Sequence, residues 1–242
     1  MKKLYIFIKI IVLISVFYNL IAFAAKKGND IPIYSVETME KVVSITFDAA
    51  WGASDTDIIL ELLEKYNAKS TFFMCGYWIE KYPEEAKRIM NNGHDIANHG
   101  NKHAHVASLD YEGNIREIKD AHSIAFDILG IEMDLYRPPY GEYNDTVLKA
   151  ARDLGYFTIQ WDVDSLDWKR EGVDKMVDRV LNHKNLKNGS ILLFHNDLDD
   201  TPDALEIILN SLIDKGYSFK PISELIYREN FEQDITGRQF KK

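Results

Sequence analysis

The strongest constraint on the fold is a regular alternation, after residue 40, of short apolar segments with longer amphipathic ones. Seven apolar segments predict strands, at residues 41–47, 69–76, 94–99, 133–139, 156–164, 189–196 and 217–223. Helical periodicity predicts helices between them, at residues 55–67, 82–93, 111–129, 144–155, 173–185 and 201–216, with a short helix after the last strand. Strands that alternate with helices indicate a parallel sheet, and nearly continuous apolar strands indicate a sheet covered on both faces. We therefore predict an α/β fold, a distorted (β/α) barrel of about seven parallel strands. An open doubly wound sheet is the alternative.

The first 25 residues have the pattern of an export segment. A basic start precedes an apolar run that ends in small residues, which indicates a signal peptide cleaved after Ala24 or a retained membrane anchor. The run from Leu4 is long enough to cross a hydrocarbon layer of about 30 Å, although it contains Lys9. The rest of the chain would then act outside the cytoplasm, secreted or attached to the membrane only through this segment.

The remaining boundaries follow from composition. We expect 1–25 to be the signal or anchor, 26–40 a linker, 41–228 the folded domain, and 229–242 a polar tail that frays. The net charge of -9 argues against a nucleic-acid partner. Cys75 is the single cysteine, so no intramolecular disulfide can form. The sequence leaves the oligomeric state open.

Ionisable residues gather where the predicted strands end. The residues with this property are Asp48, His99, His103, Arg137, Asp164 and His195. In β/α barrels the chemistry lies at the carboxyl ends of the strands. Their shared position therefore predicts one functional site, although each residue alone has a plainer explanation as a helix cap, a surface group or a core histidine.

Several of these residues have neighbours that suggest a role. His99 and His103 are spaced so that two imidazoles can converge on one ion. Pro138 and Pro139 restrict the backbone after Arg137, as a simple turn also would.

Asp164 could orient the His195 ring, because a carboxylate that accepts from one ring nitrogen fixes the tautomer. Flat aromatic faces suit sugar rings, and Trp51 and Trp168 are the candidates for such contacts. Trp78 and Trp161 are expected in the core.

Five short motifs occur in order: "TFD", "HGNKH", "RPPYG", "DSLDW" and "LLFH". They resemble the motifs of the polysaccharide deacetylases, the NodB-type homology domain of carbohydrate esterase family four. The resemblance spans residues 41–226 and is greatest to the sporulation-type and clostridial members. It implies a distorted barrel that removes acetyl groups from N-acetylated sugars of chitin or peptidoglycan. It also implies a divalent metal, zinc first, with cobalt or manganese as alternatives.

The resemblance also implies roles for individual residues. Asp48 matches the catalytic base, Arg137 its partner, and His99 and His103 the metal ligands. Tyr140 matches the residue whose backbone amide contributes to the oxyanion hole.

Other matched residues form the acid and the pocket walls. Asp164 and His195 match a general acid oriented by a carboxylate. Trp168 and Leu193 match the walls around the acetyl methyl group.

One position departs from this pattern. The resemblance implies a metal-binding aspartate directly after the base, where this chain has Ala49. A third donor could be Asp48 itself, a neighbour, or water; the neighbours considered are Asn98, Asn101 and His105.

Two functions therefore stay open. The first is an exported deacetylase acting on N-acetylglucosamine or N-acetylmuramic acid units of a glycan. The second is a degenerate protein of the same fold that binds glycan without turnover.

Overall fold

The computed structural model describes residues 31–242. The predicted export segment and the start of the predicted linker lie outside this range. Within it, no helix combines the length and apolar character needed to cross a membrane.

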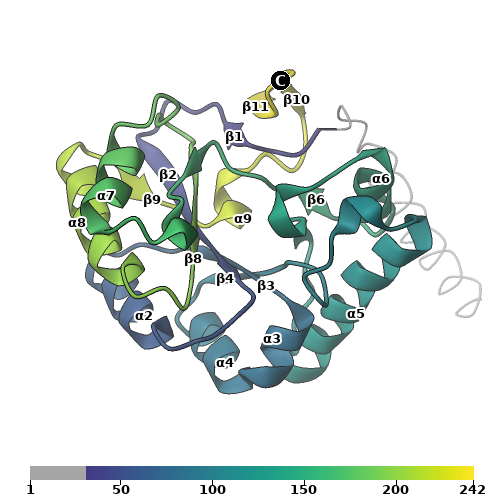
Figure 1. Ribbon diagram of the computed structural model, residues 1–242. Helices are drawn as coiled ribbons and strands as arrows, with labels where there is room; N and C mark the ends of the chain where they lie inside the picture. Colours follow the sequence, from purple (N-terminus) through teal and green to yellow (C-terminus); the bar gives the residue numbers. More distant parts are fainter. Residues whose placement is uncertain (1–30) are drawn as a thin grey trace, which may run out of the picture.

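A curved parallel sheet forms the centre of the fold (Figure 1). Its strands are β2 (Val42–Ala49), β3 (Thr71–Met74), β4 (Asp95–Asn98), β5 (Leu135–Tyr136), β6 (Phe157–Thr158), β7 (Val163–Asp164), β8 (Ile191–His195) and β9 (Ser218–Phe219). The order is β6-β5-β4-β3-β2-β8-β7, and β9 pairs with the start of β2. The seven strands of this order are joined by parallel pairings. The predicted distorted barrel is confirmed, and the doubly wound alternative is not what forms.

Helices surround this sheet. They are α2 (Thr56–Lys65), α3 (Gly76–Lys81), α4 (Pro83–Asn91), α5 (Tyr111–Leu129), α6 (Asp145–Asp153), α7 (Val173–Leu181), α8 (Thr201–Asp214) and α9 (Ile222–Leu225). Helix α5 is capped at both ends: the Asp110 side chain accepts a hydrogen bond from the Gly113 amide at 2.7 Å, and Gly130 ends the helix with φ 71°. The short helix α3 was not predicted.

The predicted strand at 156–164 is in fact two strands. Its first part, β6, pairs with β5, whereas its second part, β7, pairs with β8 at the other end of the strand order. The chain between them therefore crosses from one edge of the curved sheet to the other. Ile33 lies against this crossing: its amide donates to the Thr158 carbonyl at 2.8 Å, and its carbonyl accepts from the Gln160 amide at 2.7 Å.

The expected linker and tail are also part of the folded unit. β1 (Ser35–Val36) pairs with β11 (Arg238–Lys241), which pairs in turn with β10 (Phe231–Gln233). The predicted fraying of the tail is therefore wrong. Gln239 explains why, because its fully buried side chain accepts from the Tyr227 amide at 2.9 Å and donates to the Tyr227 carbonyl at 3.0 Å. The tail is thus held in place by a buried polar side chain, which a search for hydrophobic periodicity does not detect.

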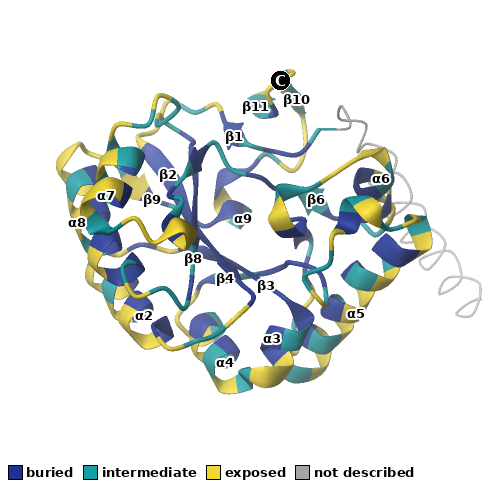
Figure 2. Ribbon diagram, in the orientation of Figure 1, coloured by how far each residue is buried: buried dark blue, intermediate teal, exposed yellow. Residues whose placement is uncertain are grey.

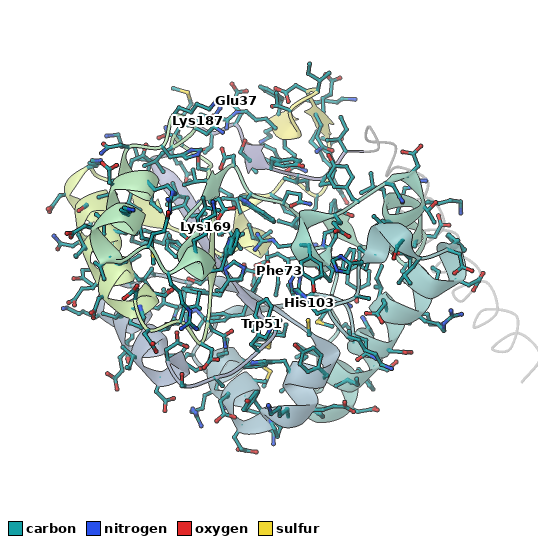
Figure 3. The ribbon with its side chains drawn as sticks, in the orientation of Figure 1. Glu37, Trp51, Phe73, His103, Lys169 and Lys187 are labelled. Atoms are coloured by element: carbon teal, nitrogen blue, oxygen red, sulfur yellow. The ribbon has the colours of Figure 1, made fainter. Side chains whose placement is uncertain are left out.

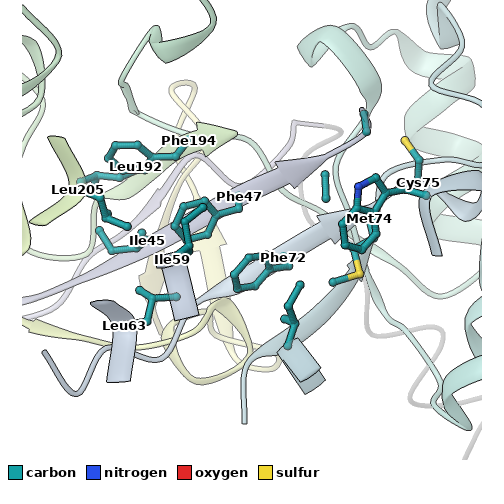
Figure 4. Packing of buried hydrophobic residues seen from close by; sticks show 14 of the residues in the cluster. Ile45, Phe47, Ile59, Leu63, Phe72, Met74, Cys75, Leu192, Phe194 and Leu205 are labelled. Carbon is teal, nitrogen blue, oxygen red and sulfur yellow. The ribbon is translucent and has the colours of Figure 1, made fainter. Parts of the chain in front are cut away.

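The core occupies both faces of the sheet, and every residue of β2 is buried (Figure 2). Phe47 points toward the helices and stacks on Phe72 with ring centroids 4.8 Å apart (Figure 4). Side chains alternate along a strand, so Thr46 and Asp48 face the opposite side, where both contact Arg137. This alternation places the acidic end of β2 inside the barrel.

Candidate active site

The carboxyl ends of the strands enclose a cavity of about 450 Å³. It is lined by Asp48, Trp51, His99, His103, Tyr140, Gly141, Trp161, Asp164, Trp168, Leu193 and His195. The structure brings together every predicted site residue at this cavity, except that Arg137 lies fully buried beneath it. Trp161, expected in the core, lines the cavity instead, whereas Trp78 is fully buried as expected.

Asp48 and Arg137 form a buried ion pair in the floor of the cavity. The Nη1 group of Arg137 donates to Asp48 Oδ1 at 2.7 Å and to Thr46 Oγ1 at 3.0 Å. Nη2 donates to the Gln160 carbonyl at 3.2 Å, and the guanidinium lies 4.0 Å from the centre of the Phe73 ring. Burial, the largest single effect, opposes ionisation of Asp48, but the charge and hydrogen bond of Arg137, with contributions from His99 and His195, together hold the pKa of that carboxyl below its usual value. Asp48 is therefore an anion, with Oδ2 available to another partner.

His99 faces that second oxygen. Its Nδ1 lies 2.8 Å from the Arg137 carbonyl, which can only accept, so Nδ1 carries the proton. The lone pair of Nε2 is then exposed toward Asp48 Oδ2, 3.5 Å away. Burial lowers the pKa of His99, which favours the neutral ring. Two ligand atoms about 2.1 Å from one tetrahedral ion are about 3.4 Å apart, so this pair has the spacing of atoms that share an ion.

His103 lies at the rim. Its ring centroid is 5.0 Å from that of His99, 5.0 Å from Trp51 and 4.4 Å from Tyr140. Burial lowers the pKa of His103 to about 4, which leaves its imidazole neutral. Figure 3 labels Trp51 and His103 next to one another near the centre of the molecule.

The donor set for a metal is incomplete. Across residues 31–242, no group of three or more His, Cys, Asp or Glu side chains is arranged to hold an ion. Ala49 is fully buried in the main apolar cluster and offers only a methyl group.

The neighbours considered as third donors are engaged elsewhere. The Asn98 amide donates to the Ile118 carbonyl at 2.9 Å, and its oxygen accepts from the Gly100 amide at 2.8 Å. His105 stacks on Tyr140 and places Nδ1 3.0 Å from Glu142. The side-chain oxygen of Asn101 lies close to the backbone of Gly76, since a Cβ added there would be only 2.5 Å from it, and Asn101 does not line the cavity. Of the alternatives, Asp48 itself is the protein group best placed beside His99.

The carboxylate that holds His195 is Asp167, not Asp164. Oδ1 of Asp167 lies 2.7 Å from Nδ1 of His195, and its Oδ2 accepts from the His195 amide at 2.7 Å. Thr201 also donates to Oδ2, at 3.2 Å. Burial, the largest single effect, lowers the pKa of His195, but the hydrogen bond and charge of Asp167, together with the charges of Asp48 and Asp164, raise that pKa above its usual value. His195 is thus oriented and held toward its protonated form.

Asp164 has a different role in the same motif. It accepts from the Leu166 amide at 2.8 Å and from the Trp161 indole at 3.2 Å. Leu166 adopts a left-handed conformation, φ 52°, which turns the chain and brings Asp167 under the histidine. Both aspartates lie in "DSLDW", so sequence spacing could not distinguish them.

Aromatic residues form the mouth of the cavity. Trp51 and Trp168 are each 55% exposed and Tyr140 is 54% exposed, which is unusual for large apolar side chains unless they contact a ligand. Tyr140 lies in a tight turn (Pro139–Gly141) with φ 58°, a conformation that a non-glycine residue rarely adopts.

Fold and site together define a class of protein: a β/α barrel with an ionised carboxylate and a carboxylate-bound histidine at its carboxyl rim. Asp48 and His195 are direct neighbours across the β2–β8 pair. Comparison with known proteins identifies the family within that class. Residues 35–159 match the family described as polysaccharide deacetylase.

Individual relatives agree with this match. The chain is 37% identical over 198 residues to a peptidoglycan-N-acetylglucosamine deacetylase of Bacillus cereus. That alignment covers 80% of this chain and 92% of the relative. It is 31% identical over 200 residues to a peptidoglycan-N-acetylmuramic acid deacetylase of Bacillus subtilis. That alignment covers 81% of this chain and 75% of the relative. A solved CE4 family pseudoenzyme from Bacillus anthracis superposes with a TM-score of 0.78 at 30% identity, over 83% of this chain and 70% of that one. The chain belongs to the polysaccharide deacetylase family, hydrolases that act on C–N bonds.

Proposed function

We propose that the protein is an exported deacetylase that hydrolyses the N-acetyl group of amino sugars in a cell-wall or chitin-type glycan. The observation that carries this proposal is the pairing of an anionic Asp48 with a proton-bearing His195 at one cavity. The similarity to peptidoglycan deacetylases supports a cell-wall glycan as the substrate class. The apolar segment at the start of the chain supports export.

The two side chains suit the two proton transfers of amide hydrolysis. Asp48 is the base that takes a proton from the attacking water, because Arg137 keeps it ionised. His195 is the acid that protonates the leaving amine, because Asp167 keeps its proton in place.

A divalent cation fits one side of this arrangement. Asp48 Oδ2 and His99 Nε2 have the spacing of shared ligands, and His103 is adjacent. These residues would hold zinc, cobalt or manganese, which when bound would polarise the acetyl carbonyl. The remaining donors would be water or substrate oxygen, since Ala49 cannot contribute.

The cavity walls account for recognition of the acetylated sugar. Leu193 and Trp168 offer apolar surface to the acetyl methyl, and Trp51 offers a face for a sugar ring. The backbone amide of Tyr140, which lies in a tight turn beside the cavity, would stabilise the oxyanion.

A second candidate function rests on a specific observation. The incomplete donor set at Ala49 and the likeness to a CE4 family pseudoenzyme favour a protein that binds glycan without hydrolysing it. A mutant of such a pseudoenzyme with restored enzymatic activity superposes with a TM-score of 0.78 at 31% identity, covering 83% of this chain and 72% of that one.

One experiment separates the two. The purified full-length protein is incubated with N-acetylglucosamine tetramer and with a glycan of alternating N-acetylglucosamine and N-acetylmuramic acid, with and without added zinc, cobalt or manganese. The deacetylase releases acetate, and a chelator stops the release. Saturable binding with no acetate under any metal would instead establish the binding protein.

A further inference from the structure

The loop that follows β4, residues 99–105, carries both histidines of the candidate metal site. His99 comes directly after β4 and is fixed in place, because it is buried and its Nδ1 bonds to the Arg137 carbonyl. His103 lies further along the loop, at the rim of the cavity. The place of its ring beside His99 therefore depends on the course of the loop between them.

Two residues of this loop have a left-handed backbone conformation. Gly100 has φ 77°, and His103 has φ 52°, which a residue with a side chain rarely adopts. Backbone turns of this kind direct successive amide groups into one concave space, an arrangement that binds anions. The conformation is unfavourable at His103, so it persists only where the surrounding structure holds it.

A carboxylate from α5 occupies the inside of this turn. Oε2 of Glu117 accepts from the Asn101 amide and from the Lys102 amide, both at 2.9 Å. A Cβ at Gly100 would lie 3.3 Å from the same oxygen, so the carboxylate also fits closely against this glycine. One side-chain oxygen thus holds the backbone of the residues that separate the two histidines.

The other side of the loop is held by α3. The Gly76 amide donates to the Gly100 carbonyl at 3.0 Å, and the Tyr77 amide donates to the Asn101 carbonyl at 3.1 Å. The first amides of a helix have no partner within the helix, so the loop supplies the acceptors that this helix start needs. Helices α3 and α5 lie side by side (Figure 1). The loop is therefore clamped between them, with two carbonyls bonded to α3 and two amides bonded to α5.

We propose that Glu117 is a positioning residue for the metal site: its carboxylate fixes the loop so that the His103 imidazole faces the ion beside His99. Glu117 is not among the described residues that line the cavity, so it acts through His103 rather than on the ion. Because Ala49 contributes no donor, the site depends all the more on where His103 lies. This inference rests on the proposed function, in which these residues hold a divalent cation.

Three substitutions of Glu117 separate its geometry from its charge, with zinc binding to the full-length protein measured by calorimetry. Glu117→Ala removes the acceptor, and it should weaken zinc binding by about tenfold or more, as losses of groups that orient ligands do. Glu117→Asp keeps the charge but withdraws the oxygen from the two amides, so it should also weaken binding. Glu117→Gln loses the charge but keeps an oxygen in reach of both amides, so it should retain most of the native affinity.

The control is Asp120→Ala, which removes an exposed carboxylate from the same helix and should leave zinc binding unchanged. Retained affinity in Glu117→Asp with weakened affinity in Glu117→Gln would overturn the inference, because the charge of Glu117 would then matter and its geometry would not. Weakening by Asp120→Ala as large as that by Glu117→Ala would also overturn it.

A double-variant cycle asks whether Glu117 acts through His103. His103→Ala should weaken zinc binding by removing a ligand. Adding Glu117→Ala to His103→Ala should then cost little more, because the loop no longer carries a ligand to position. Losses that add fully in the double variant would overturn the inference, since Glu117 would then act by another route.

Acetate release by the native protein is measured in parallel. The expected pattern of zinc binding without any acetate would keep the positioning role and reject the catalysis. Acetate release with unchanged zinc binding in all three Glu117 variants would keep the proposed function and overturn the positioning role. A native protein that does not bind zinc would overturn the positioning role whether or not it releases acetate.

Discussion

At the scale of single residues, the site is defined by which group holds which proton. Sequence motifs located Asp48, His99, His195 and Arg137, because each lies at or directly after the end of a strand and the strands end at one rim. They could not show that Asp167 holds His195. That contact depends on the left-handed conformation of Leu166, which the motif does not reveal. Local backbone geometry, unlike strand position, leaves little trace in residue type.

The contrast between the two aspartates gives a testable prediction. Asp167→Asn removes the charge that raises the pKa of His195, so the acid loses its proton at lower pH. The alkaline limb of kcat/KM for acetate release should therefore move to lower pH. The matched Asp164→Asn should move it less, because Asp164 makes no hydrogen bond to that ring. Equal shifts in the two pH profiles would contradict the assignment.

Ala49 gives a second prediction at this scale. Ala49→Asp should tighten zinc binding by about tenfold or more, using losses on removal of supporting groups as a guide. It should also make the unfolding temperature rise more on zinc addition, because an unpaired buried carboxylate is costly and the ion relieves it. Ala50→Asp is the control, since Ala50 is equally buried one residue later. Both effects are measured by zinc titration in calorimetry and by thermal unfolding.

If Ala50→Asp tightens zinc binding as much as Ala49→Asp does, or if neither variant tightens it, position 49 has no special role in metal binding.

At the scale of elements, periodicity predicted most strands and helices, because each packs against the sheet with the spacing of its own type. It failed where tertiary pairing divides one apolar run. Residues 156–164 look like one strand, yet β6 and β7 pair with opposite edges. Likewise, the strands β10 and β11 depend on the buried amide of Gln239, which no hydrophobic pattern reports.

Asp162, which lies next to β7 and bonds to the start of β8, should make the free energy of unfolding depend on pH. The pKa of Asp162 is raised from 3.8 to about 6 by burial, so the folded state binds this proton more tightly than the unfolded state. The contribution of Asp162 to the free energy of unfolding should then fall as pH rises from about 4 through 6. Asp162→Asn should flatten this part of the pH profile in urea unfolding. An unchanged profile in the variant would show that other groups cause it.

The C-terminal hairpin offers a second prediction for elements. Gln239→Ala leaves the amide and carbonyl of Tyr227 without their partners, which should cost about 1–3 kcal/mol in the free energy of unfolding. Denaturant unfolding measures the loss, and Glu232→Ala on the exposed face of β10 is the control. A loss no larger than that of the control would mean that the hairpin is dispensable to the folded unit.

At the scale of the whole molecule, the barrel brings together Asp48 and His195, the proposed proton-transfer pair, and an incomplete set of metal ligands. The curved sheet sets both, because its carboxyl rim collects side chains from β2, β7 and β8 and from the loops after β4 and β5. Sequence reasoning could reach this conclusion because strand order in a parallel barrel is simple.

The account depends most on Asp48 as the base in a working deacetylase. The direct measurement is acetate release by the full-length protein with zinc from the alternating tetrasaccharide, for the native chain, Asp48→Asn and Asp57→Asn. Asp57 is an exposed aspartate on α2 and serves as the control. The account predicts acetate from the native chain and from Asp57→Asn, and a loss of about a hundredfold or more with Asp48→Asn. Acetate release that persists in Asp48→Asn at the native rate, or that is absent from the native protein with zinc, would contradict it.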